Sequence, residues 1–558
     1  MIKKYRLAAL FLLGIFLLSQ TNYLFSGGST FDELAIDNGN VLVFEKLKTI
    51  LNGEILEEEK LNPVFEKIHT NETYGQFVSF QQFYFSRIFN SLVLEGGENI
   101  FTNNISDSYL SKTFFGRFFY LNIYSCVILF LLFLMIEKSN TPKFSLLFLI
   151  LFLSIPSING HLLFNQKDGA FMLHFFLFCI YLLSSIKNKS VTNNLILGLL
   201  AGIVISLRLS SLIFIFFTYL FLFFKEQRLT SFSKREFCNK YLQINIYSIL
   251  FYFVLSPSAW FTPLEFIQIS IDQQILLNWT GSTLTNGNFI LANDISPWYL
   301  VTWLFYKLPL IIHISLFIFL VRIKTNLRND IVAQFSFYFL IISNIFFIVY
   351  RPPVYDGLRH FLFLIPFIAY LSLKSLYNLT ESKHINFVIL ISSIVYLSFT
   401  QFGLSEYRYI YLNEFVEEES ISGFCEDNID GCGDWLADYW GFSGRKLASY
   451  INENDLENVV YCKTVEIWQP YTNESLSPLY GLNIKTYPKV KDVEKVLVAT
   501  LYRPRYDTDS CFFKKQKISY SCEPLYSSKA YLRGTEVSLN FLNSCELTNV
   551  NIENLLYP

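Results

Sequence analysis

Charged residues are scarce in this sequence: Asp, Glu, Lys and Arg make up only 16% of its 558 residues, against about 25% in a typical soluble protein. Apolar residues make up 52% and aromatic residues 18%, and phenylalanine alone occurs 59 times. A soluble fold of this length lacks the interior for so many large apolar side chains, and disordered chains are poor in aromatics. The net charge of −2 excludes a general attraction to nucleic acid. The composition indicates a polytopic membrane protein.

Motifs that bind nucleotide phosphates are also missing. The sequence has no GxxxxGK followed by Ser or Thr, and no GxGxxG follows a predicted strand. A nucleotide-driven membrane pump therefore fits the sequence poorly.

Acidic residues are rare in the middle of the chain, where only 10 of the 46 fall between Thr113 and Thr400. Apolar runs of about 17–25 residues, long enough to cross a membrane as helices, fill this part. About eleven runs are predicted in all; the two short runs around Arg208 have one longer helix with a buried arginine as their alternative. The runs cover about 7–25, 114–136, 143–160, 169–186, 194–207, 211–224, 241–258, 297–321, 331–350, 358–377 and 385–400.

Basic residues in the short loops predict the orientation of these helices, because cytoplasmic loops are enriched in Lys and Arg. With eleven helices, the basic segments before the first helix and after every second one fall on the same side. That side is predicted to be cytoplasmic, which leaves a first loop of residues 26–112 and a C-terminal domain of residues 401–558 outside. Residues 113–400 hold the remaining helices. Residues 1–25 are predicted to be an uncleaved membrane helix, with a signal peptide as the alternative.

The fold class predicted is mainly α, a polytopic helical membrane domain followed by a small external α/β domain. Short helical, buried-strand and alternating-strand patterns in the C-terminal segment support the second part. The helix is expected at Gly444–Asn452, and the strands at Val459–Tyr461, Val496–Ala499, Lys517–Ser521 and Val537–Phe541.

Six of the nine cysteines lie in the predicted external C-terminal domain. An even number of cysteines outside the cytoplasm suggests disulfides. The local pairings that we expect are Cys425 with Cys432 and Cys511 with Cys522, with free thiols as the alternative.

Ionisable side chains near membrane depth are costly and are therefore candidates for function. Asp32 and Glu33 follow the first helix by only a few residues. A carboxylate there can take a proton from a hydroxyl group if its pKa is tuned. The alternative is a helix N-terminus, with Thr30 as N-cap and the two acids in the first turn.

A second polar group joins the third and fourth runs outside and contains His161, Asn165, Lys167 and Asp168. Lys167 can neutralise a phosphate there. The alternative is a polar loop that caps two helices, with Asp168 at an N-cap.

Two arginine-containing segments complete the external candidates. Arg208 lies within a long apolar region and needs an anion or several carbonyl groups; a structural ion pair is the alternative. Tyr355, Asp356, Arg359 and His360 join the ninth and tenth runs, in a loop that proline and glycine make a defined turn. Arginine binds phosphate with two parallel hydrogen bonds, and a purely structural loop is the alternative. Together the groups suggest a lipid-phosphate substrate and a proton acceptor.

The ordered set of these motifs resembles glycosyltransferase family 39, which includes the protein O-mannosyltransferases and the lipid A aminoarabinose transferases and has the GT-C architecture. The likeness is to a poorly characterised bacterial branch and covers about residues 31–441. One position differs from the pattern of this branch: Gln166 stands where the branch has proline. The matching segments are Asp32-Glu33, Asn165–Asp168, Gly202–Arg208, Tyr355–His360 with Pro366, Tyr407–Asn413 and Asp438–Gly441.

The resemblance implies a glycosyltransferase, of the hexosyl- or pentosyltransferase type, that uses a polyprenyl-phosphate sugar and acts on an acceptor hydroxyl at the external face. Asp32 would be the general base and Glu33 would hold the acceptor or the base, with inversion at the anomeric carbon. It also implies a multi-pass protein of the bacterial inner membrane. The sugar stays open, as does the acceptor, which is a protein, a lipid or a glycan.

The first external loop departs from the mannosyltransferase pattern, because Tyr74–Phe77 stands where that group has an element with a lysine. The contact with the donor phosphate is therefore expected elsewhere, and supporting residues are expected around it. The donor-phosphate candidates are Lys167, Arg208, Arg359 and His360, and the supporting candidates are Asn165, Asp168, Tyr355 and Asp356.

Two other functions and one cofactor stay open. A transporter or flippase of lipid-linked sugars would need similar phosphate contacts but no external base, and a polytopic scaffold would leave the ionisable residues at the helix ends unexplained. A divalent cation at the Asp-Glu pair is an alternative, since some GT-C enzymes use one. His161, His360 and the acids near them are too scattered in the sequence to predict a metal site.

Overall fold

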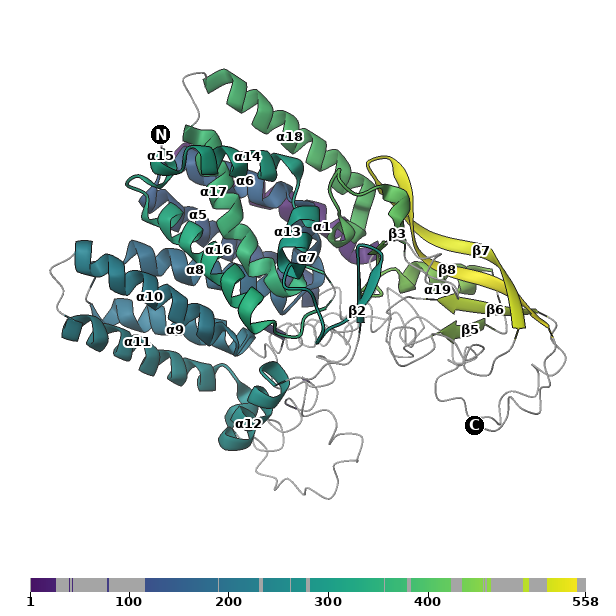
Figure 1. Cartoon of the computed structure of the whole chain (residues 1–558), viewed down its shortest axis with the longest axis horizontal. Coiled ribbons are helices and arrows are strands. Elements are labelled where there is room, and N and C mark those ends of the chain that lie inside the picture. The colour runs from purple at the N-terminus through teal and green to yellow at the C-terminus, as the bar shows by residue number, and fades with distance from the viewer. Residues whose placement is uncertain are drawn as a thin grey trace, which may run out of the picture.

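The computed structural model describes a helical body and a C-terminal sheet (Figure 1). Three of the predicted site residues, Asp32, Glu33 and Asp356, lie outside the described residues. The described residues are 2–26, 40, 43, 78–79, 116–188, 190–229, 234–260, 262–276, 282–355, 357–378, 383–422, 434–454, 456, 459–462, 495–500 and 519–548.

Each of the eleven predicted apolar runs contains a helix or a pair of helices, as expected for long segments that are rich in Leu, Ile and Phe. The first part of the helical body is formed by α1 (Ile2–Ser26), η2 (Arg117–Tyr124), α5 (Ser125–Ser139), α6 (Pro142–Ser154), α7 (Pro156–Phe164), α8 (Asp168–Ser184), α9 (Val191–Leu207), α10 (Ser211–Leu229) and α11 (Lys234–Val254). The second part is formed by η3 (Pro257–Trp260), α12 (Pro263–Gln274), α13 (Tyr299–Lys307), α14 (Leu310–Val321), α15 (Ile323–Leu327), α16 (Ile331–Tyr350), η4 (Arg359–Leu364), α17 (Ile365–Asn378), α18 (Lys383–Leu404), η5 (Ser405–Ile410) and η6 (Glu418–Ser420).

By length and composition, four helical segments within the described residues can cross a membrane, and six can if each bent pair counts as one. The pair α6 and α7 is bent by 78° and the pair α13 and α14 by 116°. A proline follows the first helix of each pair, Pro156 in one and Pro309 in the other, and its ring cannot continue a helix. Shorter apolar helices include α8 and α9. The count of eleven spans stays a prediction.

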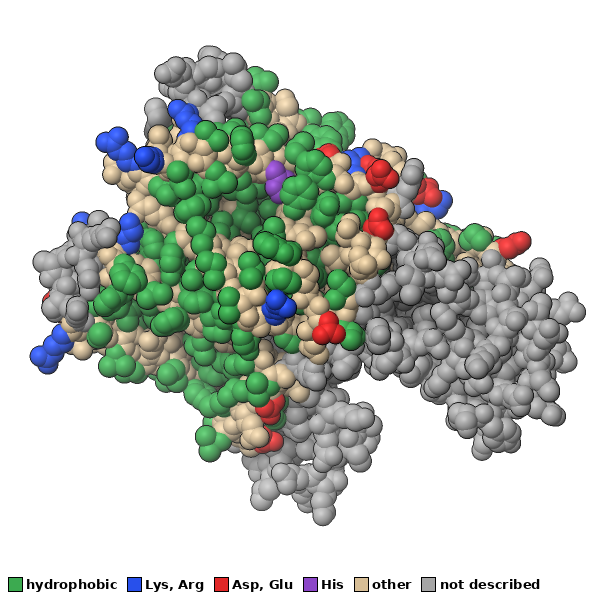
Figure 2. Space-filling view, in the orientation of Figure 1, with side chains coloured by type: hydrophobic (Ala, Val, Ile, Leu, Met, Phe, Trp, Pro, Cys, Tyr) green, Lys and Arg blue, Asp and Glu red, His purple; other side chains and the backbone are tan. Residues whose placement is uncertain are grey.

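The surface of the helical body is largely apolar (Figure 2). Large side chains stand exposed on several helices, for example Phe11 at 71%, Val349 at 78% and Phe402 at 78%. In this view Lys and Arg gather mostly at the left edge of the body, and Asp and Glu mostly at its right and lower edges. An exposed apolar surface of this kind is typical of helices in contact with lipid.

Arg208 separates two helices. α9 ends at Leu207, Arg208 has an extended backbone (φ −150°, ψ 112°), and α10 begins at Ser211. The alternative of one long helix through Arg208 is therefore wrong. The side chain leaves the chain at a break between two apolar helices rather than from a helix face.

Two glycines let α9 approach α11 closely. A Cβ atom at Gly198 would lie 2.3 Å from the Cβ of Tyr247, and one at Gly202 would lie 2.6 Å from the Cβ of Phe251. Small residues four positions apart on one helix face allow this close packing. In a membrane, van der Waals contacts of this kind hold helices together, because lipid removes the hydrophobic driving force between them.

Two small sheets accompany the helical body, and the first takes two of its strands from the segment between α12 and α13. In the first, of order β2-β1-β4-β3, the hairpin β1–β2 turns at Asn286 and Gly287 (φ 50° and 75°), as a two-residue turn requires. The second has the order β5-β6-β8-β7. The elements are β1 (Ser282–Thr285), β2 (Asn288–Leu291), β3 (Ile421–Ser422), β4 (Trp435–Leu436), α19 (Gly444–Glu453), β5 (Val459–Cys462), β6 (Lys495–Thr500), β7 (Ser519–Leu532) and β8 (Thr535–Thr548).

The predicted C-terminal helix and strands are all present, but the last two strands are far longer than predicted. β7 and β8 form one long hairpin, in which Cys522 lies opposite Cys545 in the register. Cys425, Cys432 and Cys511 lie outside the described residues, so the disulfide pairings stay predictions.

The turn of this hairpin is attached to the end of the helical body (Figure 1). Arg533 donates hydrogen bonds to the carbonyl oxygens of Leu412 (2.8 Å) and Val416 (2.5 Å) and pairs with Glu418. A Cβ atom at Gly403 in α18 would lie 2.6 Å from the carbonyl oxygen of Tyr531 in β7. The sheet and the last long helix are therefore in direct contact.

Backbone also meets backbone between α7 and η5. A Cβ atom at Gly160 would lie 2.3 Å from the backbone nitrogen of Tyr409. This contact places the segment after α18 directly on the short helix that leads into the polar loop at Asn165.

Candidate functional site

The loop between α7 and α8 is shaped by Asn165. Its Oδ1 accepts hydrogen bonds from the backbone N–H of Asp168 (2.8 Å) and of Lys167 (3.2 Å), an arrangement by which asparagine commonly starts a turn. The expected capping role therefore falls to Asn165 rather than to Asp168. The Asp168 carboxylate is left to act elsewhere.

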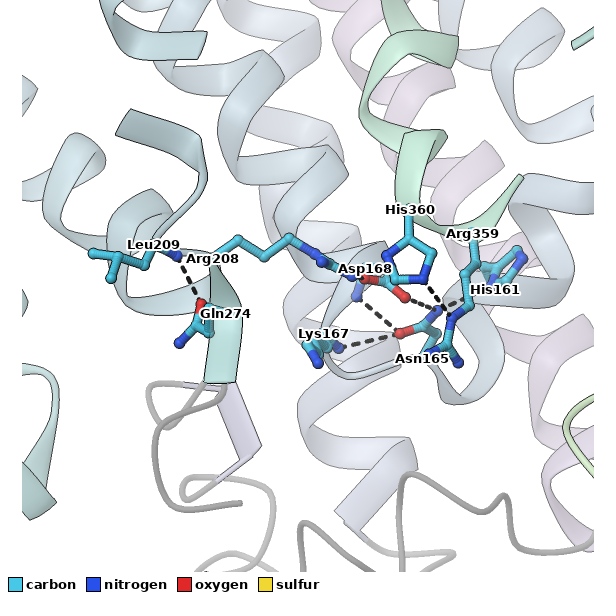
Figure 3. Close-up of polar contacts among 9 residues, drawn as sticks. All are labelled: His161, Asn165, Lys167, Asp168, Arg208, Leu209, Gln274, Arg359 and His360. Atoms are coloured by element: carbon cyan, nitrogen blue, oxygen red, sulfur yellow. Dashed lines mark hydrogen bonds and ion pairs between the residues drawn. The ribbon is translucent and has the colours of Figure 1, made fainter. Parts of the chain in front are cut away.

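Asp168 pairs with Arg208, forty residues further along the chain (Figure 3). Both side chains lie mostly out of solvent, with 3% of the Asp168 side chain and 15% of the Arg208 side chain exposed. Asn165 Nδ2 also donates to Asp168 Oδ2 (3.2 Å). The structural ion pair that was the alternative for Arg208 is thus present, and it joins two of the predicted clusters.

The Arg208 break is held from a third element. The backbone N–H of Leu209 donates to Gln274 Oε1 at the end of α12 (2.8 Å) (Figure 3). The sequence pattern did not single out Gln274, and a glutamine at the end of a short helix offered no signal that could have found it.

The loop between α16 and η4 is a defined turn, as predicted. Arg351 takes a left-handed conformation (φ 46°) directly after α16, and Gly357 does so further on (φ 71°). Tyr299 donates its hydroxyl hydrogen to the carbonyl oxygen of Gly357 (3.1 Å). The turn delivers Arg359 to the start of η4 in a buried position.

Arg359 lies over two aromatic rings. Its guanidinium carbon is 4.5 Å from the centroid of Tyr355 and 4.6 Å from that of Trp440. Its Nε donates to Nε2 of His360 (3.3 Å), whose ring packs edge-to-face on Tyr355 at 4.8 Å. The three predicted residues Tyr355, Arg359 and His360 thus form one unit, and Trp440 joins it from the C-terminal segment.

His161 connects the two arginine clusters. Its Nδ1 is 3.0 Å from Asn165 Nδ2, its Nε2 is 3.3 Å from the Tyr439 hydroxyl, and its ring centroid is 6.4 Å from that of Trp440. An unbroken series of contacts results. In order, its members are Arg208, Asp168, Asn165, His161, Trp440, Arg359 and Tyr355.

Lys167 lies at the edge of this series, beside Asp168 in Figure 3. It is half-buried, and its backbone is fixed by Asn165. Of the eight donor-phosphate and supporting candidates, the structure therefore brings seven together. The eighth, Asp356, lies outside the described residues.

Two buried cations near the site were missed by the sequence reasoning. Lys307 at the end of α13 donates to the carbonyl oxygen of Tyr409 (2.8 Å), and Arg117 at the start of η2 lies over the ring of Phe442 (5.2 Å). Both come from the ends of apolar helices, where basic residues also occur as ordinary flanking groups. Their type alone therefore could not separate them from such groups.

The turn that carries Trp440 is closed by Asp438. Its carboxylate accepts hydrogen bonds from the backbone N–H of Phe442 (3.0 Å) and Ser443 (2.7 Å) and from the Tyr409 hydroxyl. Burial raises the pKa of the Asp438 carboxyl above its ordinary value, and the hydrogen bonds from Ser443 and Tyr409 oppose that shift. Asp438 thereby ties the C-terminal segment to η5.

The helix that precedes Asp32 is attached to the same body. Gln20 in α1 donates to Oδ1 of Asn159 in α7, and Arg408 donates to the same oxygen (2.9 Å). The Arg408 guanidinium also lies 4.0 Å from the ring centroid of Tyr23. The C-terminal part of α1 is therefore bound to Asn159, which precedes His161 by two residues.

Within the part of the chain that the structure describes, no three His, Cys, Asp or Glu side chains are grouped as a metal site would require. The placement of Asp32 and Glu33 stays a prediction, as does a divalent cation beside them.

Comparisons with known proteins found a likeness in structure. No protein-family model and no curated protein matches the sequence. Among solved structures, the chain is similar to ArnT from Cupriavidus metallidurans in the apo state, with 10% identity over 99% of this chain and 100% of that chain and a TM-score of 0.49. It is also similar to the same enzyme bound to undecaprenyl phosphate, with 9% identity over 98% and 99% of the two chains and a TM-score of 0.48.

Proposed function

We propose that the chain is a membrane glycosyltransferase that transfers a sugar from a polyprenyl-phosphate donor to an acceptor hydroxyl at the external face of the bacterial inner membrane. The observation that supports this most is the contact series from Arg208 to Arg359. It brings together Arg208 and Arg359 from two distant segments, with Lys167 at its edge, at the ends of apolar helices, where a lipid phosphate would lie.

The charges of this cluster suit a phosphate leaving group. Arg208 and Arg359 are the cations of the series, Lys167 lies at its edge, and Asp168 is the single carboxylate among the described members. Negative charge grows on the lipid phosphate as its bond to the sugar breaks, and fixed cations stabilise that charge. Exposed apolar side chains on the helices that end at these segments, such as Leu212 in α10 and Val349 in α16, suit contact with the polyprenyl chain.

The general base in this proposal is Asp32, which takes the proton of the acceptor hydroxyl. The hydroxyl oxygen attacks the anomeric carbon, the bond from that carbon to the phosphate oxygen breaks, and the lipid phosphate leaves with the electron pair. Direct displacement inverts the anomeric centre. Glu33 holds the acceptor or Asp32 in place.

The attachment of α1 supports a position of Asp32 near the cations. Ser26, the last residue of α1, precedes Asp32 by six residues, which span at most about 20 Å. Gln20 contacts α7 and Tyr23 contacts η5, so the segment that leads to Asp32 begins beside the site.

The orientation can be tested with a native thiol. Cys238 is exposed near the start of α11, in a segment predicted to be cytoplasmic. In intact spheroplasts a membrane-impermeant maleimide is expected to leave Cys238 unlabelled, and to label it after permeabilisation. Labelling in intact spheroplasts would overturn the proposed orientation.

The activity is tested by incubating the purified protein with a panel of polyprenyl-phosphate sugars and measuring the released lipid phosphate by mass spectrometry. Asp32→Asn is expected to abolish release while the protein still inserts and folds. Asp37→Asn, which removes a carboxylate from the same loop, is the matched control and should retain turnover. Retained turnover in Asp32→Asn would sink the assignment of the base. Lipid-phosphate binding without release by the wild type would favour a transporter or flippase.

A further inference from the structure

The C-terminal segment enters the candidate donor site through one side chain. Trp440 is fully buried, and its ring packs on Phe164 of α7 (5.6 Å) and on the Arg359 guanidinium (4.6 Å). Arg359 and Trp440 are about eighty residues apart in the sequence. The contact therefore exists only because the segment after η5 folds back onto the helical body.

The contacts with the two rings are compatible with hydrogen bonds in the plane of the guanidinium. Tyr355 and Trp440 contact the group at 4.5 and 4.6 Å from their ring centroids. A cation is attracted to the face of an aromatic ring, whereas the N–H groups of arginine point outward in its own plane. Two rings thus fix the orientation of that plane and remain compatible with a bidentate phosphate contact.

Trp440 itself is held by a network that a loose surface loop would lack. Asp438 closes the turn with Phe442 and Ser443, and Gly441 adopts a left-handed conformation (φ 70°). Asn540 in β8 donates to the carbonyl oxygen of Ser443 (3.1 Å) and to its hydroxyl oxygen (2.7 Å). The long hairpin therefore supports the turn from behind.

We propose that Trp440 is a positioning residue, which together with Tyr355 orients the Arg359 guanidinium for the phosphate of the polyprenyl donor. This inference rests on the proposed function and assigns the donor-phosphate contact to Arg359. The external C-terminal segment then completes the donor site rather than forming a separate accessory domain. A helical body without this turn would keep Arg359 but lose its orientation.

The test measures binding of undecaprenyl phosphate to the purified full-length protein in detergent, by fluorescence-based titration. Trp440→Leu, which keeps an apolar side chain but removes the ring, is expected to weaken binding about tenfold. Trp440→Phe keeps a ring over the guanidinium and is expected to stay within about threefold of wild type. In an Arg359→Ala background, Trp440→Leu is expected to cause no further loss, because the tryptophan acts through the arginine.

The control for lost packing is Phe148→Leu, which removes a buried ring of α6 that stacks on Phe152 and Phe176. It is expected to lower thermal stability as Trp440→Leu does but to leave lipid-phosphate affinity unchanged. In turnover assays, Trp440→Leu should raise the KM for the donor far more than it lowers kcat.

The possible results separate the two claims. If Trp440→Leu weakens binding equally with and without Arg359, or if Trp440→Phe behaves like Trp440→Leu, the positioning role is overturned while the proposed function stands. If wild type fails to bind undecaprenyl phosphate, both claims fall together. If binding follows the expected pattern but no sugar is transferred, the positioning role stands and the glycosyltransferase does not.

Discussion

Arg208 and Arg359 are both buried or nearly buried arginines at the ends of apolar helices, yet the chain holds them in different ways. Arg208 extends from a helix break to the carboxylate of Asp168. Arg359 lies over the rings of Tyr355 and Trp440. The ion pair ties the Arg208 break to the start of α8, whereas the two ring contacts tie Arg359 to its own loop and to the C-terminal segment. The difference suggests a division of work, in which Arg208 joins the helical elements and Arg359 contacts the donor.

The largest effect is expected from breaking the Asp168–Arg208 pair. Asp168→Ala leaves a mostly buried guanidinium without its carboxylate, which typically costs about 3–5 kcal/mol. Thermal unfolding of the purified protein in detergent should show a large fall in Tm. The double variant Asp168→Ala/Arg208→Leu is expected to recover part of the loss, because no unpaired charge remains.

The matched control for this pair is Arg351→Ala, since Arg351 is an exposed arginine at the end of another helix. Its Tm should stay close to that of wild type. A Tm for Asp168→Ala as high as that of the control would show that the pair does not hold the helices together.

A smaller but more specific effect is expected at Arg359. Arg359→Lys keeps the positive charge but loses the planar fork and its stacking, so kcat/KM for the donor should fall by about 10- to 100-fold with little change in Tm. Donor-concentration series with the purified protein give this ratio. The corresponding Arg208→Lys variant should show the opposite pattern, with a clear fall in Tm and a smaller change in kcat/KM. The proposed division of work is contradicted if the two lysine variants behave alike in both assays.

The smallest effect is expected from the support of the Arg208 break. Gln274→Leu removes the acceptor of the Leu209 N–H and should cost about 1 kcal/mol of stability. Gln268→Leu, at an exposed position on α12, is the comparison variant. Equal Tm values for the two would show that the hydrogen bond to Leu209 contributes nothing measurable.

The helices could be predicted from sequence because an apolar run of membrane length has few alternatives, and each of the eleven runs contains one. Their bends were not predicted. Pro156 and Pro309 mark those bends, but proline in an apolar run is also compatible with a straight membrane helix whose neighbours satisfy the freed groups. The β7–β8 hairpin was predicted too short, because its small and polar residues alternate only locally.

The candidate site shows the same limit. The loops at Asn165–Asp168 and Tyr355–His360 could be identified from their residue types. The pairing of Asp168 with Arg208 and the stacking of Trp440 on Arg359 depend on which helix ends meet in three dimensions. Residue spacing does not show which helix ends lie side by side. Trp440 belongs to the matching segment Asp438–Gly441, but the sequence assigned it no role.

The contact of Gly160 with Tyr409 has a practical meaning for anyone who engineers this chain. Where two elements meet through side chains, a substitution can often be accommodated by a change of rotamer. Here one peptide backbone rests on another, and His161 and Tyr409 are adjacent to that contact. The smallest added methyl group would therefore act as a spacer between two modules. Gly160 should therefore be left unchanged in a mutant library. A Gly160→Ala variant would measure how far α7 and η5 can be separated before the site loses its function.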